Sequence, residues 1–216
     1  MKQIFQGIWQ REKELLTQNL VPGFREYGKL VTISGKEFRI WDHRKSKAAA
    51  ALVKGLKTFP IKKGCKILYL GISSGSTASF FSDIIGENGI IYGIEVAERS
   101  IRDLNPVAEK RKNIVPILAS ARSPENYSWV EPVDIVYQDV ATDDQSEILI
   151  RNCQAFLKKD GYAMIAIKSR SINVVKNPRE VYKDELKKLK QHFEILDKRE
   201  LDPYEKDHMF ILMKWK

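Results

Sequence analysis

The stretch Ile67-Leu68-Tyr69-Leu70-Gly71-Ile72-Ser73-Ser74-Gly75-Ser76 decides the fold of this 216-residue chain. Its first four residues are a short apolar run, which predicts a buried strand. The G-x-x-x-G loop that follows permits a sharp turn and a close approach of the backbone to a ligand. Residues 77–85 then predict a helix. A strand, a glycine loop and a helix in this order are typical of the first unit of a parallel α/β sheet.

Strands and helices alternate after this unit. We expect strands at 90–96, 114–118, 133–138, 162–167, 193–196 and 208–213, and helices at 98–112, 143–158 and 179–191. The link 197–207 holds no helix, so the last two strands must pair as a hairpin and the last strand must run antiparallel. The pattern predicts an α/β fold with a seven-stranded, mostly parallel sheet and an antiparallel last strand. This is the class I S-adenosylmethionine-dependent methyltransferase fold, whereas a nicotinamide-binding sheet is all parallel.

The segment before the alternation has a different character. Residues 31–33 and 37–41 are β-type runs around Ser34-Gly35, which predicts a hairpin. We therefore expect a small β-rich N-terminal subdomain over 1–45 and a Rossmann-like domain over 46–216. Ser46 is placed to cap a helix that runs from Lys47 to about Phe59.

The charge is distributed unevenly. Residues 1–65 carry 14 Lys and Arg against 5 Asp and Glu, and the rest of the chain carries 23 against 23, so the net charge of +9 belongs to the first third. Such asymmetry favours a polyanionic partner, of which nucleic acid is the commonest. The alternative is a lysine-rich solvated surface, as in many thermophile proteins.

Several protein classes are disfavoured by composition. No apolar run is long enough for a membrane span, and the N-terminus has no signal-like apolar region. Cys65 and Cys153 form no C-x-x-C pair and have no nearby histidine, so neither a disulfide framework nor a metal site is expected. We predict a cytoplasmic protein that does not contact membranes.

A carboxylate accompanies the glycine loop. Glu95 ends the second predicted strand, 20 residues after Gly75. A carboxylate at this place can accept hydrogen bonds from both ribose hydroxyls of a nucleoside. The loop lacks G-x-G-x-x-G, so it favours S-adenosylmethionine over a dinucleotide. The alternative is a tight turn beside a surface glutamate.

Polar residues stand where apolar strands end. Asp139 and Lys168 each follow a predicted parallel strand, and His208 starts the reversed last strand, so all three belong to one edge of the sheet. Lys47 opens a helix that can reach the same edge. These groups suit the methylation of a weakly acidic hydroxyl such as a ribose 2′-OH, with a lysine as general base. Taken singly, each is also a common solvated strand end or surface histidine.

Four segments give the chain a resemblance to a known family. They are EFRIWDHRKSKAAA (37–50), GISSGSTASFFSDI (71–84), YQDVA (137–141) and PYEKDH (203–208). They are similar to archaeal fibrillarin, a guide-RNA-dependent ribose 2′-O-methyltransferase family, and the similarity covers nearly the whole chain. Related heat-shock-type RNA methyltransferases carry Glu where His208 stands. The family usually has Asp at the position of Ser120, Thr at Ser76, His at Phe80 and Gln at Thr142.

The resemblance implies a Lys-Asp-Lys-His active site made of Lys47, Asp139, Lys168 and His208. It also implies a pocket for S-adenosylmethionine, to which we add the two loop glycines. The expected cofactor-binding residues are Gly71, Gly75, Ser76, Thr77, Glu95, Val96, Ser120, Ala121, Asp139, Val140, Ala141 and Thr142. At the mouth of the crevice we expect RNA contacts from Arg44, Lys45 and Arg170.

The resemblance also implies partners, because the chain has no dedicated RNA-recognition domain. They are a Nop-domain scaffold protein, a kink-turn-binding ribosomal-type protein and a box C/D guide RNA, with rRNA or tRNA as the target. Two alternatives stay open at this point. One is a class I methyltransferase that acts alone on RNA or a small molecule, and the other is a non-catalytic RNA–protein scaffold.

Overall fold

A seven-stranded sheet forms the centre of the molecule in the computed structural model, which describes residues 1–216. The strand order is β11-β12-β10-β9-β6-β7-β8, and β12 lies antiparallel between β10 and β11. The predicted methyltransferase fold and the antiparallel last strand are therefore confirmed. The strands are β6 (Lys66–Leu70), β7 (Ile90–Glu95), β8 (Ile114–Leu118), β9 (Val133–Gln138), β10 (Leu157–Lys168), β11 (Phe193–Glu200) and β12 (His208–Trp215).

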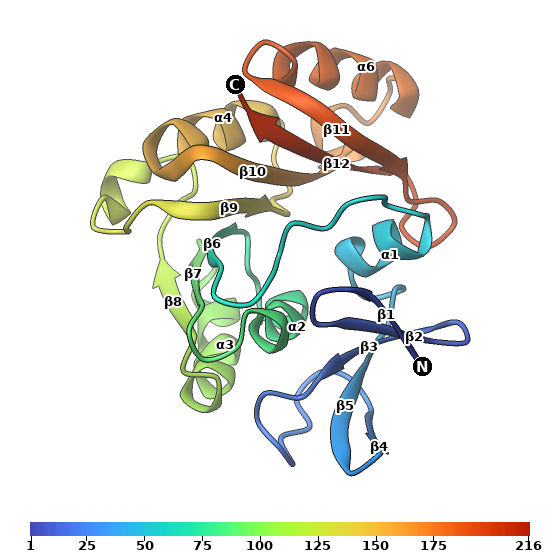
Figure 1. The fold of residues 1–216 in the computed structure, drawn as a ribbon. Helices are drawn as coiled ribbons and strands as arrows, with labels where there is room; N and C mark the ends of the chain where they lie inside the picture. Colours follow the sequence, from blue (N-terminus) through green and yellow to red (C-terminus); the bar gives the residue numbers. More distant parts are fainter.

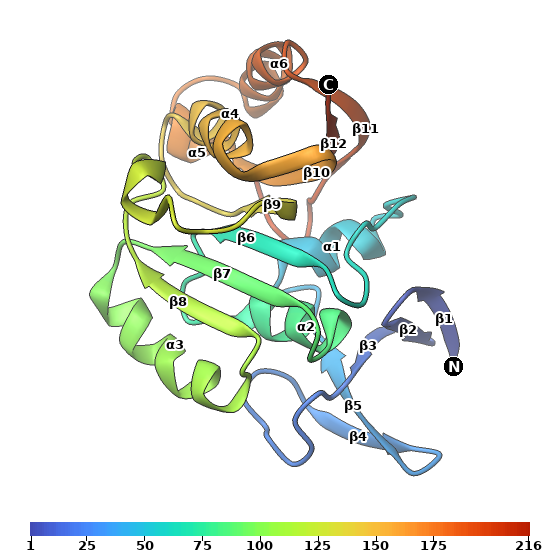
Figure 2. The same cartoon turned by 60° about the vertical axis from the view of Figure 1, so that its left-hand side comes forward.

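Helices cover both faces of this sheet (Figures 1 and 2). On one face pack α1 (Lys47–Val53), α2 (Ser76–Ile85) and α3 (Glu98–Lys110). On the other face lie the 3₁₀ turn η1 (Pro124–Tyr127), α4 (Gln145–Phe156), the short α5 (Ser169–Ile172) and α6 (Pro178–Leu189). Each face has its own apolar core, because alternate residues of the strands point to opposite sides. None of the helices has the length and apolarity that crossing a lipid bilayer requires.

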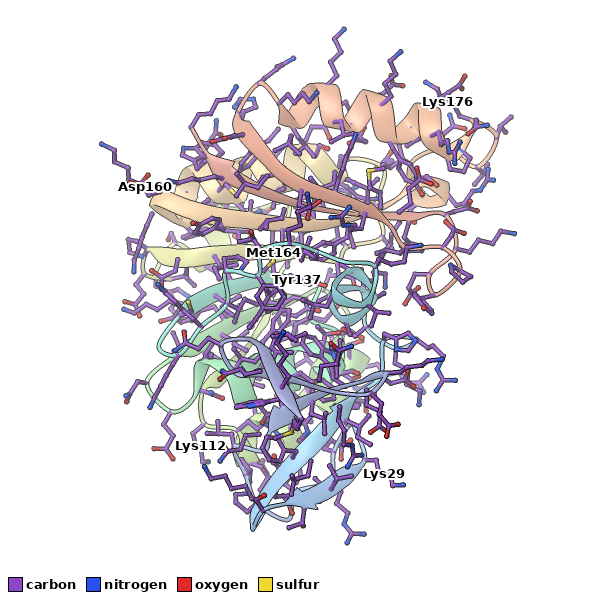
Figure 3. All side chains as sticks on the ribbon, turned by 45° about the vertical axis from the view of Figure 1, so that its right-hand side comes forward. Lys29, Lys112, Tyr137, Asp160, Met164 and Lys176 are labelled. Atoms are coloured by element: carbon purple, nitrogen blue, oxygen red, sulfur yellow. The ribbon has the colours of Figure 1, made fainter.

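Apolar and aromatic side chains fill the space between the layers, and charged side chains lie on the surface. Tyr137 and Met164, on neighbouring strands, are 0% exposed and lie between the layers in Figure 3. In the same view the charged side chains of Lys29, Asp160 and Lys176 point outward.

Several predicted boundaries were wrong. The helix expected to reach Phe59 ends at Val53, because Gly55 takes a left-handed conformation (φ 83°) that an α-helix cannot continue. The helix predicted over 143–158 is shorter at both ends, and its last residues already belong to β10. Strand β11 extends four residues beyond Leu196, paired to β12 along its length.

The N-terminal segment forms a five-stranded antiparallel sheet of order β1-β2-β3-β5-β4. Its strands are β1 (Lys2–Phe5), β2 (Ile8–Arg11), β3 (Glu14–Gln18), β4 (Leu30–Ile33) and β5 (Lys36–Trp41). The predicted hairpin is confirmed as β4–β5, and Ser34 and Gly35 both have positive φ, as a two-residue type I′ turn requires. The first three strands were not individually predicted, since their apolar runs are short.

The two sheets share one hydrophobic core. Ile8, Leu15 and Trp41 of the small sheet belong to the same cluster as Phe80 and Phe81 of α2. Trp41 stacks on Phe80 with ring centroids 5.3 Å apart. The division into domains at residue 45 stays a prediction, because the packing is continuous across it.

A buried charge cluster also joins the small sheet to the rest of the molecule. The Asp83 carboxylate of α2 accepts a hydrogen bond from Arg111 (2.6 Å) and lies 3.5 Å from the Arg39 guanidinium of β5, and all three side chains are 0% exposed. Thr17 and the backbone N–H of Leu20 donate to the same carboxylate. Burial lowers the pKa of Arg39 to about 10, and Asp83 opposes that shift.

Candidate active site

The predicted catalytic side chains come from four elements that meet at one edge of the large sheet. Asp139 follows β9, Lys168 ends β10 and His208 begins β12. Lys168 and His208 are paired directly across the β10–β12 ladder, because β12 runs in the opposite direction. Lys47 is the first residue of α1, which packs beside β12. Chain topology thus brings together groups that are up to 161 positions apart in the sequence.

Asp139 is the centre of this group. Its Oδ1 lies 2.8 Å from Lys168 Nζ and its Oδ2 lies 3.2 Å from Lys47 Nζ. The Lys168 ammonium also donates to the Asp139 carbonyl oxygen (2.9 Å). One carboxylate therefore positions two ammonium groups.

His208 is held at the same edge by its own loop. Its Nδ1 lies 2.6 Å from the carbonyl oxygen of Lys206. A carbonyl oxygen only accepts, so Nδ1 carries the proton, and Nε2 of the neutral ring is left as an acceptor. This contact fixes the orientation of the imidazole at the edge of the sheet.

Glu205 is a site residue that the sequence did not indicate. Its carboxylate lies 3.9 Å from Lys47 Nζ, which is also 3.2 Å from Asp139. The loop that carries it is fixed by Tyr204, whose ring packs edge-on against His43 at 4.4 Å. The segment 203–208 carried part of the family resemblance, but no local sequence pattern distinguishes a functional glutamate in a polar loop from a solvent-exposed one.

A cavity of about 360 Å³ adjoins Asp139 and contains most of the predicted cofactor residues. It lies over the carboxyl ends of β6, β7 and β9, where ligands bind in open α/β sheets. From the prediction it includes Gly71, Glu95, Val96, Ser120, Ala121, Asp139, Val140, Ala141 and Thr142, and it adds Ser73, Ile94, Ala119, Arg122 and Ile148. Gly75, Ser76 and Thr77 do not line it.

Both loop glycines have the positive φ that the predicted sharp turn requires, and both also allow close packing against other parts of the protein. Gly75 has a φ of +86°, and a Cβ there would lie 2.5 Å from Leu104 Cδ1 of α3. A Cβ on Gly71 (φ +77°) would lie 3.0 Å from the Asp139 carbonyl oxygen. Both glycines therefore allow the loop to pack against protein, and Gly71 brings Asp139 close to the cofactor loop.

Thr77 connects the cofactor loop to the catalytic lysine. Its hydroxyl donates to Ser46 Oγ (3.0 Å), and Ser46 caps α1 by accepting from the N–H of Ala49. The cap precedes Lys47 directly. Thr77 thus supports the position of the lysine, and the structure gives it no place in the cavity wall.

Glu95 has the geometry of a preorganised acceptor. Its carboxylate accepts backbone hydrogen bonds from Ser73, Val96 and Ala97, each at 2.9 Å. A carboxylate has about four lone-pair sites, so it can still accept from a ligand hydroxyl. Val96 beside it is 70% exposed and offers an apolar surface to a planar base. These residues and the small alanines of the cavity fit S-adenosylmethionine.

The position of Ser120 leaves the far end of the cavity without the family's carboxylate. Ser120 Oγ accepts from the Arg122 backbone N–H (3.3 Å). The Arg122 guanidinium binds Asp144 (2.8 Å) and Asp143 (3.2 Å), and its hydrogen bond lowers the pKa of Asp144. The neighbouring acidic groups are therefore engaged by Arg122 and do not replace the missing carboxylate.

Replacing Glu95 by Ala should weaken S-adenosylmethionine binding by about 1.5–3 kcal/mol, roughly 10- to 150-fold, because ligand hydroxyls lose a charged acceptor. Calorimetric titration measures the change. Glu98→Ala, at the exposed start of α3, is the matched control and should leave affinity unchanged. Equal affinity of wild type and Glu95→Ala would contradict this assignment.

The predicted RNA contacts differ in their freedom. Arg44 and Lys45 line a cavity of about 440 Å³ next to Ser46, together with Lys13 and Lys29 of the small sheet. Arg170 links two loops, and we call these contacts the Arg170 clamp. Its Nε donates to Asp207 (3.0 Å) and its Nη1 donates to the carbonyl oxygen of Val174 (2.8 Å). The Arg44 guanidinium donates to both carboxylate oxygens of Asp42 (3.1 and 3.2 Å), and Arg170 orders the loop after α5. Of the three residues, only Lys45 makes no ion pair within the protein and is free for a phosphate backbone.

Comparison with known proteins decides the family. The fibrillarin family model matches residues 1–216.

The chain belongs to the fibrillarin family.

Relatives agree over nearly the whole length. A fibrillarin-like rRNA/tRNA 2′-O-methyltransferase of Pyrococcus furiosus is 50% identical over 205 residues, 94% of this chain and 90% of the relative. The solved fibrillarin of Aeropyrum pernix, with natively bound S-adenosyl-L-methionine, is 50% identical with a TM-score of 0.87, covering 93% of this chain and 88% of that one. The fibrillarin of a solved fibrillarin/Nop5p complex is 35% identical with a TM-score of 0.91, and all of both chains is covered.

Proposed function

We propose that this fibrillarin transfers the methyl group of S-adenosylmethionine to ribose 2′-hydroxyls of rRNA and tRNA, as the catalytic subunit of a box C/D guide ribonucleoprotein. The observation that carries this proposal is the Asp139 carboxylate, which lies within 3.2 Å of two lysine ammonium groups at the rim of the cofactor cavity. The relatives named above support the reaction and its cofactor.

The reaction requires the 2′-hydroxyl to lose its proton as its oxygen attacks a methyl group. S-adenosylmethionine supplies that methyl group on a positively charged sulfur. Lys168, in its neutral form, accepts the proton at Nζ, and Asp139 fixes the direction of that nitrogen through its carbonyl oxygen. Lys47 stays charged beside Asp139 and Glu205, and stabilises the negative charge that develops on the ribose oxygen.

The proposed partners are supported by a solved relative and by the charge of the surface. The chain's charged surfaces can hold a phosphate backbone but provide no means of choosing a sequence. A Nop-domain scaffold is supported by the relative solved with Nop5p. A box C/D guide RNA and a kink-turn-binding ribosomal-type protein complete the proposal, and a cytoplasmic location remains a prediction of the sequence.

Methyl transfer to an RNA target should require the assembled particle. We expect purified protein with S-adenosylmethionine to leave a target RNA unmodified, and protein with guide RNA and both partner proteins to methylate one guide-paired ribose. Tritiated-methyl incorporation measures both, and a guide with a scrambled spacer is the control. Equal incorporation by the isolated protein would favour the stand-alone methyltransferase. No incorporation by a correctly assembled particle would favour the non-catalytic scaffold.

A further inference from the structure

A second charged hollow lies outside the site described above. A groove of about 740 Å³ runs between α6 and the edge strand β11. Five cationic residues line this α6–β11 groove, against the two carboxylates of Asp184 and Glu200. The cations are Arg179, Lys183, Lys187, Lys190 and Lys198.

The cations of α6 form a row. Arg179, Lys183 and Lys187 follow one another at four-residue intervals, so they share one face of the helix and lie about 6 Å apart along its axis. Lys198 faces them from β11. A row with this spacing can follow successive phosphates of one RNA strand.

Most of these charges are unused within the protein. Lys183, Lys187, Lys190 and Lys198 take part in no ion pair, although neighbouring lysines do. The carboxylates of the groove are already engaged, Asp184 by Lys176 and Glu200 by Arg179 (3.7 Å). An anionic ligand would therefore meet free ammonium groups.

The floor of the groove argues for RNA over a protein. Tyr182, Leu186 and Met209 lie beneath the cations but are only 3–8% exposed. A protein interface usually has an apolar centre with charged residues at its rim. Here the accessible surface is ammonium and guanidinium, the surface that phosphates bind.

The groove and the active-site edge both include residues of β12. Met209 and Glu200, paired in the β11–β12 ladder, line the groove, and Met209 directly follows His208. On the other side, α5 packs against α6, and the Arg170 clamp orders the loop between them. The groove is thus joined to the active-site edge through β12 and through the packing of α5 on α6.

We propose that the α6–β11 groove binds the sugar–phosphate backbone of the RNA whose target ribose lies at Asp139. This inference rests on the proposed function and adds a second contact surface to it. The groove contacts phosphates, so its contribution is the same for every target sequence.

The test compares two triple variants in the assembled particle. Lys183→Ala/Lys187→Ala/Lys198→Ala removes three free lysines of the groove. Lys62→Ala/Lys63→Ala/Lys159→Ala removes three equally exposed, unpaired lysines around a cavity at the opposite edge of the sheet. Target affinity is measured across salt concentrations with an RNA that carries 2′-deoxyribose at the modified position, so binding is read without turnover.

The groove variant should bind the target more weakly, and its salt slope should fall by about 2 to 3, since each phosphate contact contributes about 0.7–0.9. Its single-turnover rate at saturating 2′-hydroxyl target should stay unchanged, and the Lys→Arg triple should restore the slope. The opposite-edge variant should behave as wild type.

Three results would overturn the proposal: an unchanged slope, an equal loss in both variants, or a groove variant that fails to bind the scaffold protein without RNA. The last would assign the groove to a protein partner. If the wild-type particle does not methylate the 2′-hydroxyl target, the proposed function fails, whereas the binding comparison with the deoxy target still stands.

Discussion

Asp139→Asn should lower methyl transfer by the assembled particle by roughly 10²–10⁴-fold, the range that loss of a general base costs. The substitution keeps the shape of the side chain but removes the negative charge shared by Lys47 and Lys168, which lie 3.2 and 2.8 Å from it. Lys47 would then keep only the more distant Glu205 as a counter-charge, and Lys168 would keep only its contact with the backbone carbonyl oxygen of residue 139. Single-turnover transfer of a tritiated methyl group measures the effect.

Two further variants make this test specific. Asp143→Asn changes a carboxylate of the following loop that is 76% exposed and binds only Arg122, so its rate should stay near wild type. Lys168→Ala should fall in the same range as Asp139→Asn. Thermal unfolding should be unchanged in all three, because none of these residues contributes to the apolar core. A near-normal rate in Lys168→Ala would place the base elsewhere, and a near-normal rate in Asp139→Asn would show that the reaction does not depend on this carboxylate.

Asp83→Asn should destabilise the fold by about 3–5 kcal/mol, because it leaves the guanidinium groups of Arg39 and Arg111 buried without a negative partner. For a chain of this size the loss corresponds to roughly 6–20 °C in the melting temperature. Denaturant unfolding and calorimetry measure both quantities.

A matched surface pair supplies the control. Asp160→Asn removes the partner of Lys214 on a side chain that is 74% exposed, where water screens the charge, so stability should hardly change. The outcome against our interpretation would be a small effect of Asp83→Asn, comparable to that of Asp160→Asn. It would mean that hydrogen bonds from Thr17 and Leu20, and not the charge, hold the small sheet against α2.

Local patterns accounted for the elements with strong periodicity. The apolar runs of β6, β7, β9 and β12 are buried on both faces, so their sequences read as continuous strands. The strands β1 to β3 of the small sheet were missed, because they are only four or five residues long. The end of α1 was also missed, since only the backbone shows that Gly55 is left-handed.

The charges were the least predictable feature. In the sequence Arg39 counts toward the basic excess of the first third, but the structure buries it beside Asp83, 44 positions away. Arg170 reads as an exposed phosphate contact, but its guanidinium is engaged by Asp207 and backbone carbonyls. Charge patterns show how many cations a segment has, and only packing shows which of them remain free.

The sequence by itself determined the fold class, the reversed last strand and hence the edge at which Asp139, Lys168 and His208 meet. It could do so because strand direction follows from the length of each connection, and the carboxyl ends of parallel strands share an edge. Only the tertiary structure decided that Asp139 binds both lysines, that Glu205 joins them, and that Gly75 serves packing against Leu104. Those contacts join side chains far apart in the chain, and their distances depend on how helices and loops pack, which no local pattern encodes.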